Sequence, residues 1–296
     1  RLQGDWSSDV CSSDLYRQRD PASGALPENF DYQHTHNVFS VADFTRSWLD
    51  LNGVALAIST ACSSSAKAFA SAWRQMSAGF CDAAVVGGVD SLCLTTLYGF
   101  HALGLASPRP CRPWDRERDG LNVGEAAGFA LLEWAEPEDR RVVLRGYGES
   151  SDAHHMTAAH PEGAGAALAM EQALARADIA PERIDYINLH GTATPSNDAA
   201  EDRAVLRVFG ADTPCSSTKG WTGHTLGAAG ITEAIFVSLC LEQGLVPASL
   251  NTRQRDPELG AGVVLENRER PLLWAMSNSF GFGGTNCSLL FGRNDG

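Results

Sequence analysis

The cysteine at position 62 stands where α/β proteins often present a nucleophile. Cys62 lies in a run of small residues, 59–65, between an apolar stretch of strand length at 54–59 and an alanine-rich, helix-favouring stretch at 66–77. A thiol at a helix N-terminus experiences the positive end of the helix dipole, which favours the thiolate. The position predicts a reactive cysteine; the alternative is an inert, buried Cys packed where space is short.

Two histidines and a lysine follow later in the chain. His190 comes directly after an expected strand at 184–189, at the sheet edge where α/β proteins bind ligands. Lys219 and His224 lie in a glycine-rich segment that opens a helix, and this segment lacks the residue order of a phosphate-binding P-loop. The alternatives are a histidine that hydrogen-bonds loop carbonyls, and glycines that allow close helix packing.

A second glycine-rich stretch joins two expected strands near the C-terminus. Residues 278–286 read Asn-Ser-Phe-Gly-Phe-Gly-Gly-Thr-Asn, and such a turn can aim backbone N–H groups at an oxyanion. One thiol and two imidazoles in one protein indicate acyl-thioester chemistry. A cysteine protease usually needs one histidine with a carboxylate or amide partner, whereas a second histidine suits a reaction that must also stabilise an enolate.

The elements that must position these side chains alternate between strands and helices. This alternation predicts an α/β fold with a largely buried sheet. A long loop is expected at 104–124, where three prolines precede a charged run. The hydrophobic patterns predict strands near 54–59, 83–86, 127–133, 141–148, 184–189, 263–267, 272–277 and 286–291, and helices near 41–49, 66–77, 166–177, 198–209 and 232–243.

A polar stretch at 133–141 is the expected boundary between two halves. The first half, 16–138, carries Cys62, and the second, 139–296, carries both histidines. Each half contains an expected strand that ends on a double glycine, at 87–88 and at 283–284, which is a weak hint of duplication.

Composition narrows the class of protein. The chain has 296 residues, 44% of them hydrophobic and 20% charged, and a formal net charge of −13. The acidic balance argues against nucleic acid as a partner. No apolar run approaches the roughly 18 residues of a membrane span, so no membrane association is expected. Eight scattered cysteines form no CxxC pair or zinc spacing, which favours a reducing, cytoplasmic compartment and no metal.

The first fifteen residues read differently from the rest. Residues 5–15, Asp-Trp-Ser-Ser-Asp-Val-Cys-Ser-Ser-Asp-Leu, have no helical or strand periodicity and resemble the translation of a short-read sequencing adapter. Residues 1–15 are therefore left out of the fold argument, as a cloning scar would be. We expect native sequence before Tyr16 to be missing.

Four motifs follow one another along the chain: Thr-Ala-Cys-Ser-Ser-Ser at 60–65, His-Gly-Thr-Ala-Thr-Pro at 190–195, Lys-x3-Gly-His-x2-Gly-Ala-Ala-Gly at 219–230, and the 278–286 stretch. In this order they resemble the motifs of the β-ketoacyl-acyl carrier protein synthases, the condensing enzymes of fatty-acid and polyketide assembly. The resemblance runs from about residue 45 to the C-terminus, and segments 112–120 and 151–157 also look like family segments. It implies a thiolase-like fold with two similar halves, central mixed sheets and buried helices, the first half being incomplete.

The resemblance also implies catalytic roles. Cys62 resembles the acylated nucleophile. His190 and His224 resemble the histidines that assist malonyl decarboxylation and stabilise the enolate. Lys219 resembles the lysine that supports this pair, with a carboxylate such as Glu201 as the expected link.

Further roles follow in the same way for the substrate-binding groups. The backbone N–H groups of Cys62 and Phe282 would form the oxyanion hole, and Phe282 also resembles the gating aromatic residue. Thr192 and Thr194 would hydrogen-bond the pantetheine arm of the carrier protein.

The implied reaction is a ping-pong condensation without a metal or an organic cofactor. The thiolate takes an acyl group from acyl carrier protein, and malonyl carrier protein then supplies the carbanion that attacks it. Carrier proteins are acidic, so a local basic patch is expected despite the negative total charge. The implied assembly is a homodimer, or a heterodimer with a related subunit.

Two other functions stay open. One is a non-catalytic chain-length partner of a heterodimeric synthase, which would typically lack the nucleophile that Cys62 supplies here. The other is a thiolase-fold acyltransferase or hydrolase, which the second histidine disfavours. Trp221 and the Ser64–Ser65 pair differ from the commonest housekeeping versions and favour a specialised polyene or polyketide-type pathway over general fatty-acid synthesis.

Overall fold

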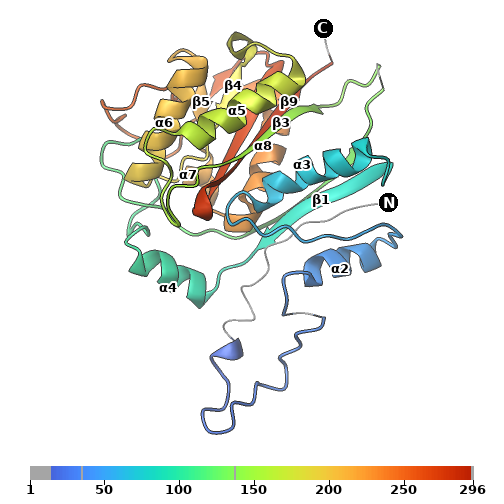
Figure 1. Cartoon of the computed structure of the whole chain (residues 1–296). Coiled ribbons are helices and arrows are strands. Elements are labelled where there is room, and N and C mark those ends of the chain that lie inside the picture. The colour runs from blue at the N-terminus through green and yellow to red at the C-terminus, as the bar shows by residue number, and fades with distance from the viewer. Residues whose placement is uncertain (1–14, 35, 137, 295–296) are drawn as a thin grey trace.

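The computed structural model describes residues 15–34, 36–136 and 138–294 (Figure 1). The expectation about an adapter sequence therefore falls, except for Leu15, outside the described residues. The elements that carry the argument are α2 (Ser40–Trp48), α3 (Ser64–Ser77), β1 (Ala83–Asp90), α4 (Leu94–Ala102), β2 (Ala126–Glu133), β3 (Val143–Ser151), α5 (Ala164–Ala177), β4 (Tyr186–Asn188), α6 (Pro195–Phe209), β5 (Cys215–Ser216), α7 (Lys219–Thr222), α8 (Ala229–Gln243), β8 (Trp274–Gly281) and β9 (Thr285–Gly292).

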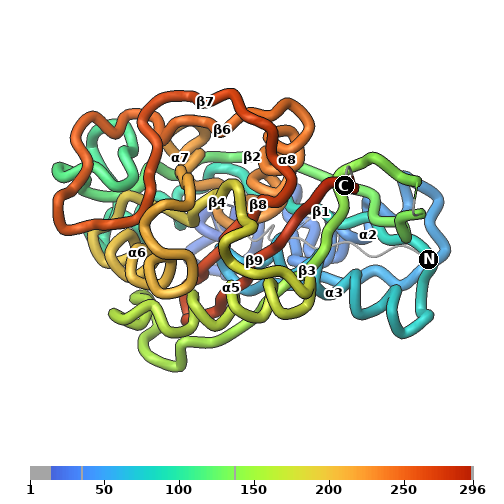
Figure 2. Tube along the Cα trace, turned by 90° about the horizontal axis from the view of Figure 1, so that it is seen from above, coloured from blue at the N-terminus to red at the C-terminus, as the bar shows by residue number. Residues whose placement is uncertain are grey.

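A five-stranded mixed sheet forms the centre of the second half. Its strand order is β3-β9-β8-β4-β5, in which β9 is antiparallel to both β3 and β8, and β4 is parallel to β8 and β5. Helices α5 and α6 pack together on one side, and α8 packs against β8 on the other (Figure 2). The α/β class and the mixed sheet are thus confirmed.

A second, smaller sheet belongs to the first half. Among the described residues it consists of β1 and β2, paired antiparallel from Ala83↔Glu133 to Asp90↔Ala126. Helices α3 and α8 contact each other and lie between this pair and the five-stranded sheet. The layered arrangement buries the two helices, whose residues Ala70, Ala72 and Val237 have no exposed surface.

The double glycine at 87–88 does not end a strand, contrary to expectation. Strand β1 continues through it to Asp90. A Cβ at Gly87 would lie 2.7 Å from the carbonyl oxygen of Gly128, and a Cβ at Gly88 would lie 2.7 Å from Cβ of Ser65. These glycines are needed because β2 and α3 approach too closely for a side chain.

Two expected strands are absent from the described residues, and helices α4 and α7 were not expected. Residues 54–59 and 263–267 form no strand; in the second segment only Val263 bridges to Cys215. A strand needs a hydrogen-bonded neighbour along its length, and apolar character alone does not supply one. Helix α4 (Leu94–Ala102) was missed because its first turn, Leu-Thr-Thr-Leu, has no strong helix signal.

Helix α8 differs from the amphipathic helix expected at 232–243. It begins at Ala229, and its buried residues lie on both sides because sheets pack against both. The helical stretch Leu226–Gln243 is long and apolar enough to cross a membrane by composition alone, contrary to the expectation that no run would qualify. It is a core helix here: 56% of the stretch is buried, and the buried Glu233 is ion-paired within the protein.

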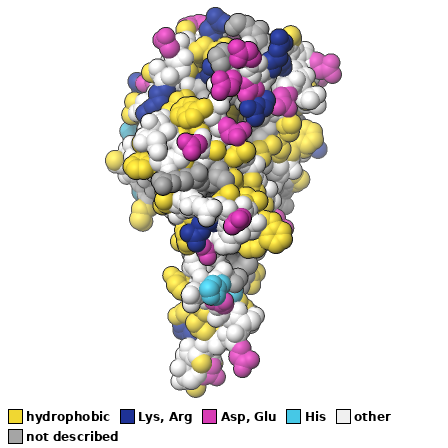
Figure 3. Space-filling view, turned by 90° about the vertical axis from the view of Figure 1, so that its right-hand side faces the viewer, with side chains coloured by type: hydrophobic (Ala, Val, Ile, Leu, Met, Phe, Trp, Pro, Cys, Tyr) yellow, Lys and Arg dark blue, Asp and Glu magenta, His cyan; other side chains and the backbone are white. Residues whose placement is uncertain are grey.

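An N-terminal arm projects from this layered body. Residues 15–39 extend away from the sheets and lead into α2, as Figures 1 and 3 show. Phe44 and Trp48 of α2 stack on each other with ring centroids 5.9 Å apart while remaining 62% and 77% exposed. The expected helix at 41–49 is therefore present, as Ser40–Trp48, with a largely solvent-facing aromatic pair.

Candidate active site

Cys62 sits in a sharp turn immediately before α3. Ala61 has a φ of 52°, a left-handed conformation that is costly for a residue with a Cβ and is often stored at functional turns. The hydroxyl of Ser63 donates to the carbonyl of Thr60, and that of Ser64 donates to the carbonyl of Ala61. These side-chain bonds fix the turn, so the small residues around the cysteine have a structural purpose.

His224 lies within hydrogen-bond reach of the thiol. Its Nε2 is 3.0 Å from Sγ of Cys62. The backbone of His224 is held by the long loop at 104–124, since its N–H donates to the carbonyl of Asn122 over 2.7 Å and its carbonyl accepts from Gly124. A loop of the first half thus positions a histidine of the second half against the nucleophile.

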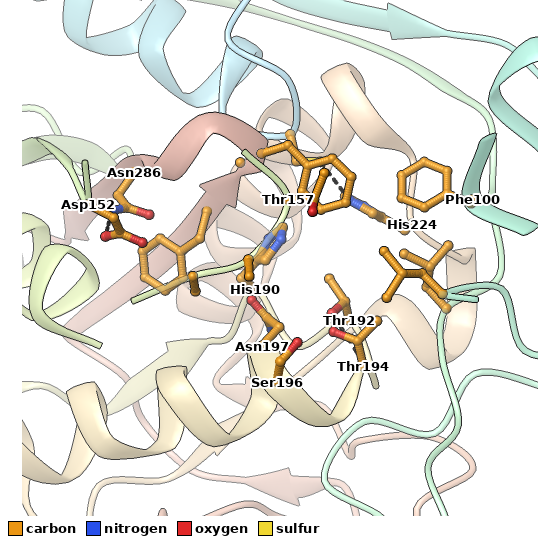
Figure 4. Close-up of a pocket in the computed structure, with 18 residues that line it drawn as sticks. Phe100, Asp152, Thr157, His190, Thr192, Thr194, Ser196, Asn197, His224 and Asn286 are labelled. Atoms are coloured by element: carbon orange, nitrogen blue, oxygen red, sulfur yellow. Dashed lines mark hydrogen bonds between the residues drawn. The ribbon is translucent and has the colours of Figure 1, made fainter. Parts of the chain in front are cut away.

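His190 completes a three-residue centre, seen in Figure 4. Its ring lies 5.3 Å from that of His224, centroid to centroid, in an edge-to-face arrangement. The ring also contacts Phe280 at 5.9 Å. Both histidines are almost fully buried, and both line the same cavity as Cys62.

Burial controls the protonation of this centre. Desolvation raises the pKa of the Cys62 thiol to about 12, although Lys219 and the backbone N–H of Phe282 act in the opposite direction. Desolvation of the thiol thus acts against the helix-dipole effect expected from its position in the sequence. Burial and the positive charge of Lys219 lower the pKa of both His190 and His224 well below the ordinary value, so both imidazoles are neutral at pH 7.

A buried ion pair lies behind the histidines. Nζ of Lys219 pairs with Oε1 of Glu233 on α8, and both side chains are at most 4% exposed. Glu201, which was expected to be the carboxylate partner of Lys219, bonds elsewhere. This corrects the expectation, because the carboxylate that pairs with Lys219 is that of Glu233. Burial raises the pKa of Glu233 to about 7.

Glu201 instead holds the backbone of the His190 loop. Its carboxylate accepts hydrogen bonds from the N–H groups of His190 and Gly191, each over 2.8 Å, and from the side chain of Asn278 over 3.2 Å. Desolvation raises the pKa of Glu201 to about 7, while the two backbone donors oppose that shift. The residue positions His190 through the main chain and does not contact the imidazole ring in any recorded bond.

The glycine-rich turn between β8 and β9 closes one side of the cavity. Phe282–Gly284 forms a short 3-10 turn in which Gly283 and Gly284 have φ of 81° and 73°. The strands pair in register up to Gly281↔Thr285, so the turn is anchored at both ends. The ring of Phe282 lies 5.7 Å from that of Phe100 on α4, and both line the cavity.

Two threonines also line the cavity. Thr192 and Thr194 place their hydroxyl oxygens 2.9 Å apart and are each 5% exposed. In Figure 4 they lie side by side, near His224 and the start of α6. The cavity has a volume of about 50 Å³. The thiol, two histidines, two threonines and Phe282 are thus brought together, with Lys219 and Glu201 behind them.

Sequence reasoning missed three contributors to this site. Glu233 had a detectable signal, since it is a single acid in the apolar first three turns of a helix, and a buried acid needs a partner. Phe100 had none, because α4 was not expected. Asp152 accepts from the side chain of Asn286 over 2.8 Å at the edge of the cavity, a pairing 134 residues apart in the chain that only the fold reveals.

Family comparisons agree with this geometry. Residues 22–137 match the model of the β-ketoacyl synthase N-terminal domain, and residues 141–253 match that of the C-terminal domain. The chain is 42% identical over 252 residues to the mitochondrial 3-oxoacyl-[acyl-carrier-protein] synthase of Arabidopsis thaliana, covering 78% of the chain and 55% of that protein. It is 40% identical over 261 residues to 3-oxoacyl-[acyl-carrier-protein] synthase 2 of Vibrio cholerae, covering 82% of the chain and 63% of that protein.

A solved structure extends the comparison to the fold. A ketosynthase in complex with its chain length factor from Xenorhabdus doucetiae matches 99% of this chain and 74% of its own, with a TM-score of 0.90 and 39% identity. This match confirms the expected ketosynthase fold. The chain spans between about half and two thirds of the length of the curated relatives it matches. Two domain models and these identities show that the chain belongs to the β-ketoacyl synthase family.

Proposed function

We propose that this protein is a β-ketoacyl-acyl carrier protein synthase that carries an acyl group on Cys62 and extends it by decarboxylative condensation. The observation that carries the proposal is the 3.0 Å contact between Sγ of Cys62 and Nε2 of His224, in a cavity that His190 also lines. A thiol with one imidazole suffices for acyl transfer. The second neutral imidazole is what a condensation adds.

The first half-reaction transfers the acyl group. Sγ of Cys62 attacks the thioester carbonyl, the bond from that carbon to the carrier protein's sulfur breaks, and the thiol proton passes through Nε2 of His224 to the departing thiolate. The high pKa of the thiol means that the proton must leave during attack, which makes the nearby neutral imidazole necessary as a base. The backbone N–H of Phe282, already directed at Sγ, supports the proposed oxyanion hole with that of Cys62.

The second half-reaction forms the carbon–carbon bond. A malonyl thioester loses CO2, and the electron pair of the broken carbon–carbon bond remains on the thioester as an enolate. The enolate oxygen accepts N–H hydrogen bonds from His190 and His224. The enolate carbon attacks the acyl-Cys62 carbonyl, the carbon–sulfur bond to Cys62 breaks, and a β-ketoacyl thioester leaves. Each neutral imidazole has one N–H to donate; for His224 this requires the proton on Nε2, the tautomer opposite to the one that accepts the Cys62 proton in the first half-reaction. Thr192 and Thr194 would bind the pantetheine arm.

The proposal includes the carrier and assembly expected from the sequence. Acyl carrier protein would deliver both substrates, with no metal or free cofactor, and the compartment would be the cytoplasm. The match to a ketosynthase that binds a chain length factor favours a heterodimer with a related subunit over a homodimer. Retention of Cys62 and both histidines favours the catalytic partner of such a pair. The division into halves at residue 138 remains part of this proposal.

Mass spectrometry of the protein after incubation with acyl carrier proteins of several chain lengths tests the proposal. The expected result is one acyl adduct on Cys62. Cys62→Ala should abolish the adduct while retaining malonyl decarboxylation, which the histidines perform. Cys81→Ala, a buried cysteine that does not line the cavity, serves as the matched control and should load normally. Covalent loading that survives in Cys62→Ala would contradict the assignment of the nucleophile.

A further inference from the structure

A second cavity lies at the junction of the two halves, and it shares no lining residue with the active site. It is formed by the C-terminal ends of α3 and α5, the end of β2 and the start of β3. Its volume is about 520 Å³, which is ample for a small organic molecule. The C-terminal end of α3 and the β2–β3 connection lie on the right-hand side in Figure 1, the side that Figure 3 views.

Aromatic residues form the apolar wall of this cavity. The rings of Trp73 and Trp134 meet edge to face with centroids 6.3 Å apart, and Trp73 also contacts Tyr147 at 5.9 Å. Trp134 is 53% exposed, although a tryptophan side chain is usually buried when it has a partner. Met76 and Leu144 extend the apolar surface inward. Such walls accommodate the body of a flat or aliphatic ligand.

Two arginines give the cavity a positive charge that no acid neutralises. Within the described residues, Arg145 and Arg176 take part in no ion pair; Arg145 donates to the side-chain oxygen of Asn294, and Arg176 donates to the backbone carbonyl of Tyr147 over 2.5 Å. Arg176 lies flat over the Tyr147 ring, 4.3 Å from its centroid. The guanidinium of Arg145 lies 5.8 Å from the centroid of the Trp274 ring, and its Nε is buried without a hydrogen-bond partner among the described residues.

The remaining charges on the lining limit the ligand to a single negative charge. Arg141 is paired with Asp139 over 2.5 Å and with Glu133 over 3.7 Å, so this trio carries no positive charge. Three arginines and two carboxylates leave one net positive charge on the lining, which matches the single charge of a carboxylate and would leave the further negative charges of a polyphosphate uncompensated. The acidic groups are engaged by Arg141 and are not free to hold a metal ion.

We propose that this cavity binds an organic carboxylate with a flat apolar body, its charge facing Arg145 and Arg176 and its body lying against Trp73 and Trp134. A guanidinium binds a carboxylate through paired N–H donors, and an indole face binds an apolar ring. The site is independent of the proposed condensation, because it contains none of the residues assigned to that reaction.

Calorimetric titration with 2-naphthoate tests the site directly on the intact chain. The expected result is one binding event, at least tenfold weaker with neutral 2-naphthamide, because a hydrogen bond to a charged group contributes about 1.5–3 kcal/mol, or roughly tenfold or more in affinity. Arg145→Gln combined with Arg176→Gln should weaken naphthoate binding at least tenfold. Arg207→Gln, an exposed arginine on α6 that pairs only with Glu171 at 3.6 Å, is the matched control and should change the Kd less than twofold.

Three results would overturn the proposal. These are no binding of naphthoate at millimolar concentration, equal binding of the amide, or an unchanged Kd in the double variant. If the double variant does not fold, Trp134→Ala takes its place, since this exposed side chain is safe to truncate, and it should weaken binding about fivefold or more. Protection of Cys62 from iodoacetamide by naphthoate would place the ligand in the active site and would also refute the proposal.

Discussion

A single methyl group added at the contact of α3 and α8 should separate the nucleophile from its base. In Gly230→Ala, the new Cβ would lie 2.4 Å from the backbone nitrogen of Ala66 and 2.8 Å from its Cβ. Both neighbours belong to the first turns of α3, four residues after Cys62. Non-bonded heavy atoms rest about 3.4–4.0 Å apart, so the two helices must move apart by about 1 Å.

The displacement should lower both the stability of the protein and the rate of Cys62 acylation, and the effect on the rate should be the larger one. Overpacking of this kind destabilises by about 1–3 kcal/mol, and each kcal/mol lowers the Tm by about 2–4 °C in a protein of this size class. A 1 Å shift would lengthen the 3.0 Å contact between Cys62 and His224 beyond hydrogen-bond range. Misplacement by about 1 Å lowers a rate by about 100-fold. Acylation of Cys62 should therefore fall about 100-fold while the protein stays folded.

Thermal unfolding and time-resolved mass spectrometry of the Cys62 adduct measure the two effects separately. Gly99→Ala is the matched control: Gly99 lies inside α4, and a Cβ there would meet nothing within 4 Å. It should leave the rate unchanged and leave the Tm equal or slightly higher, because alanine favours a helix over glycine. A Gly230→Ala protein with the wild-type Tm and the wild-type acylation rate would refute the reasoning.

Three other predictions follow from the buried charges and thiols. Glu233→Gln leaves the buried Lys219 ammonium unpaired and should lower the free energy of unfolding, measured with urea, by about 3–5 kcal/mol. Adding Lys219→Met should restore most of that loss, and a double variant whose two effects simply add would contradict the pairing. Because burial holds the pKa of Cys62 and of Cys111 at about 12, the folded chain keeps protons above pH 9 that the unfolded chain loses, so the free energy of unfolding should fall by about 1.4 kcal/mol per pH unit per thiol between pH 9 and 10.5. Replacing both thiols by alanine should reduce that slope but not abolish it, because burial also raises the pKa of Cys215, Cys240 and Cys287; an unchanged slope would contradict the prediction. Thr192→Val should raise KM for the carrier-bound substrate several-fold with a smaller effect on kcat, and an effect on kcat alone would argue against a binding role.

The sequence predicts the site better than the sheet around it. Cys62, His190 and His224 stand out because each lies beside small residues at the end of an element, which is a local signal. Cys62 and His224 meet at hydrogen-bond distance, and His190 lines the same cavity, which is consistent with that signal. The partner of Lys219 was misassigned to Glu201 because spacing along the chain does not reveal which acid faces inward across two elements.

The protonation state of Cys62 could not be derived from sequence position. A helix N-terminus lowers a thiol pKa by a modest dipole effect, whereas complete burial raises it more, and burial depends on loops that pack from the other half. The strand expected at 54–59 is absent for a related reason. Its apolar residues are a local property, but strand pairing requires a neighbour that the described residues do not provide.

The turn that carries Phe282 has a consequence for the speed of substrate entry. Because β8 and β9 pair up to Gly281↔Thr285, the three residues between them can change conformation without breaking the strand ladder. Motions confined to a short loop take nanoseconds to microseconds, whereas motions of whole domains take microseconds to milliseconds. A gate of this construction would open many times during each turnover. We therefore expect chemistry or carrier-protein exchange, rather than gate opening, to limit the rate.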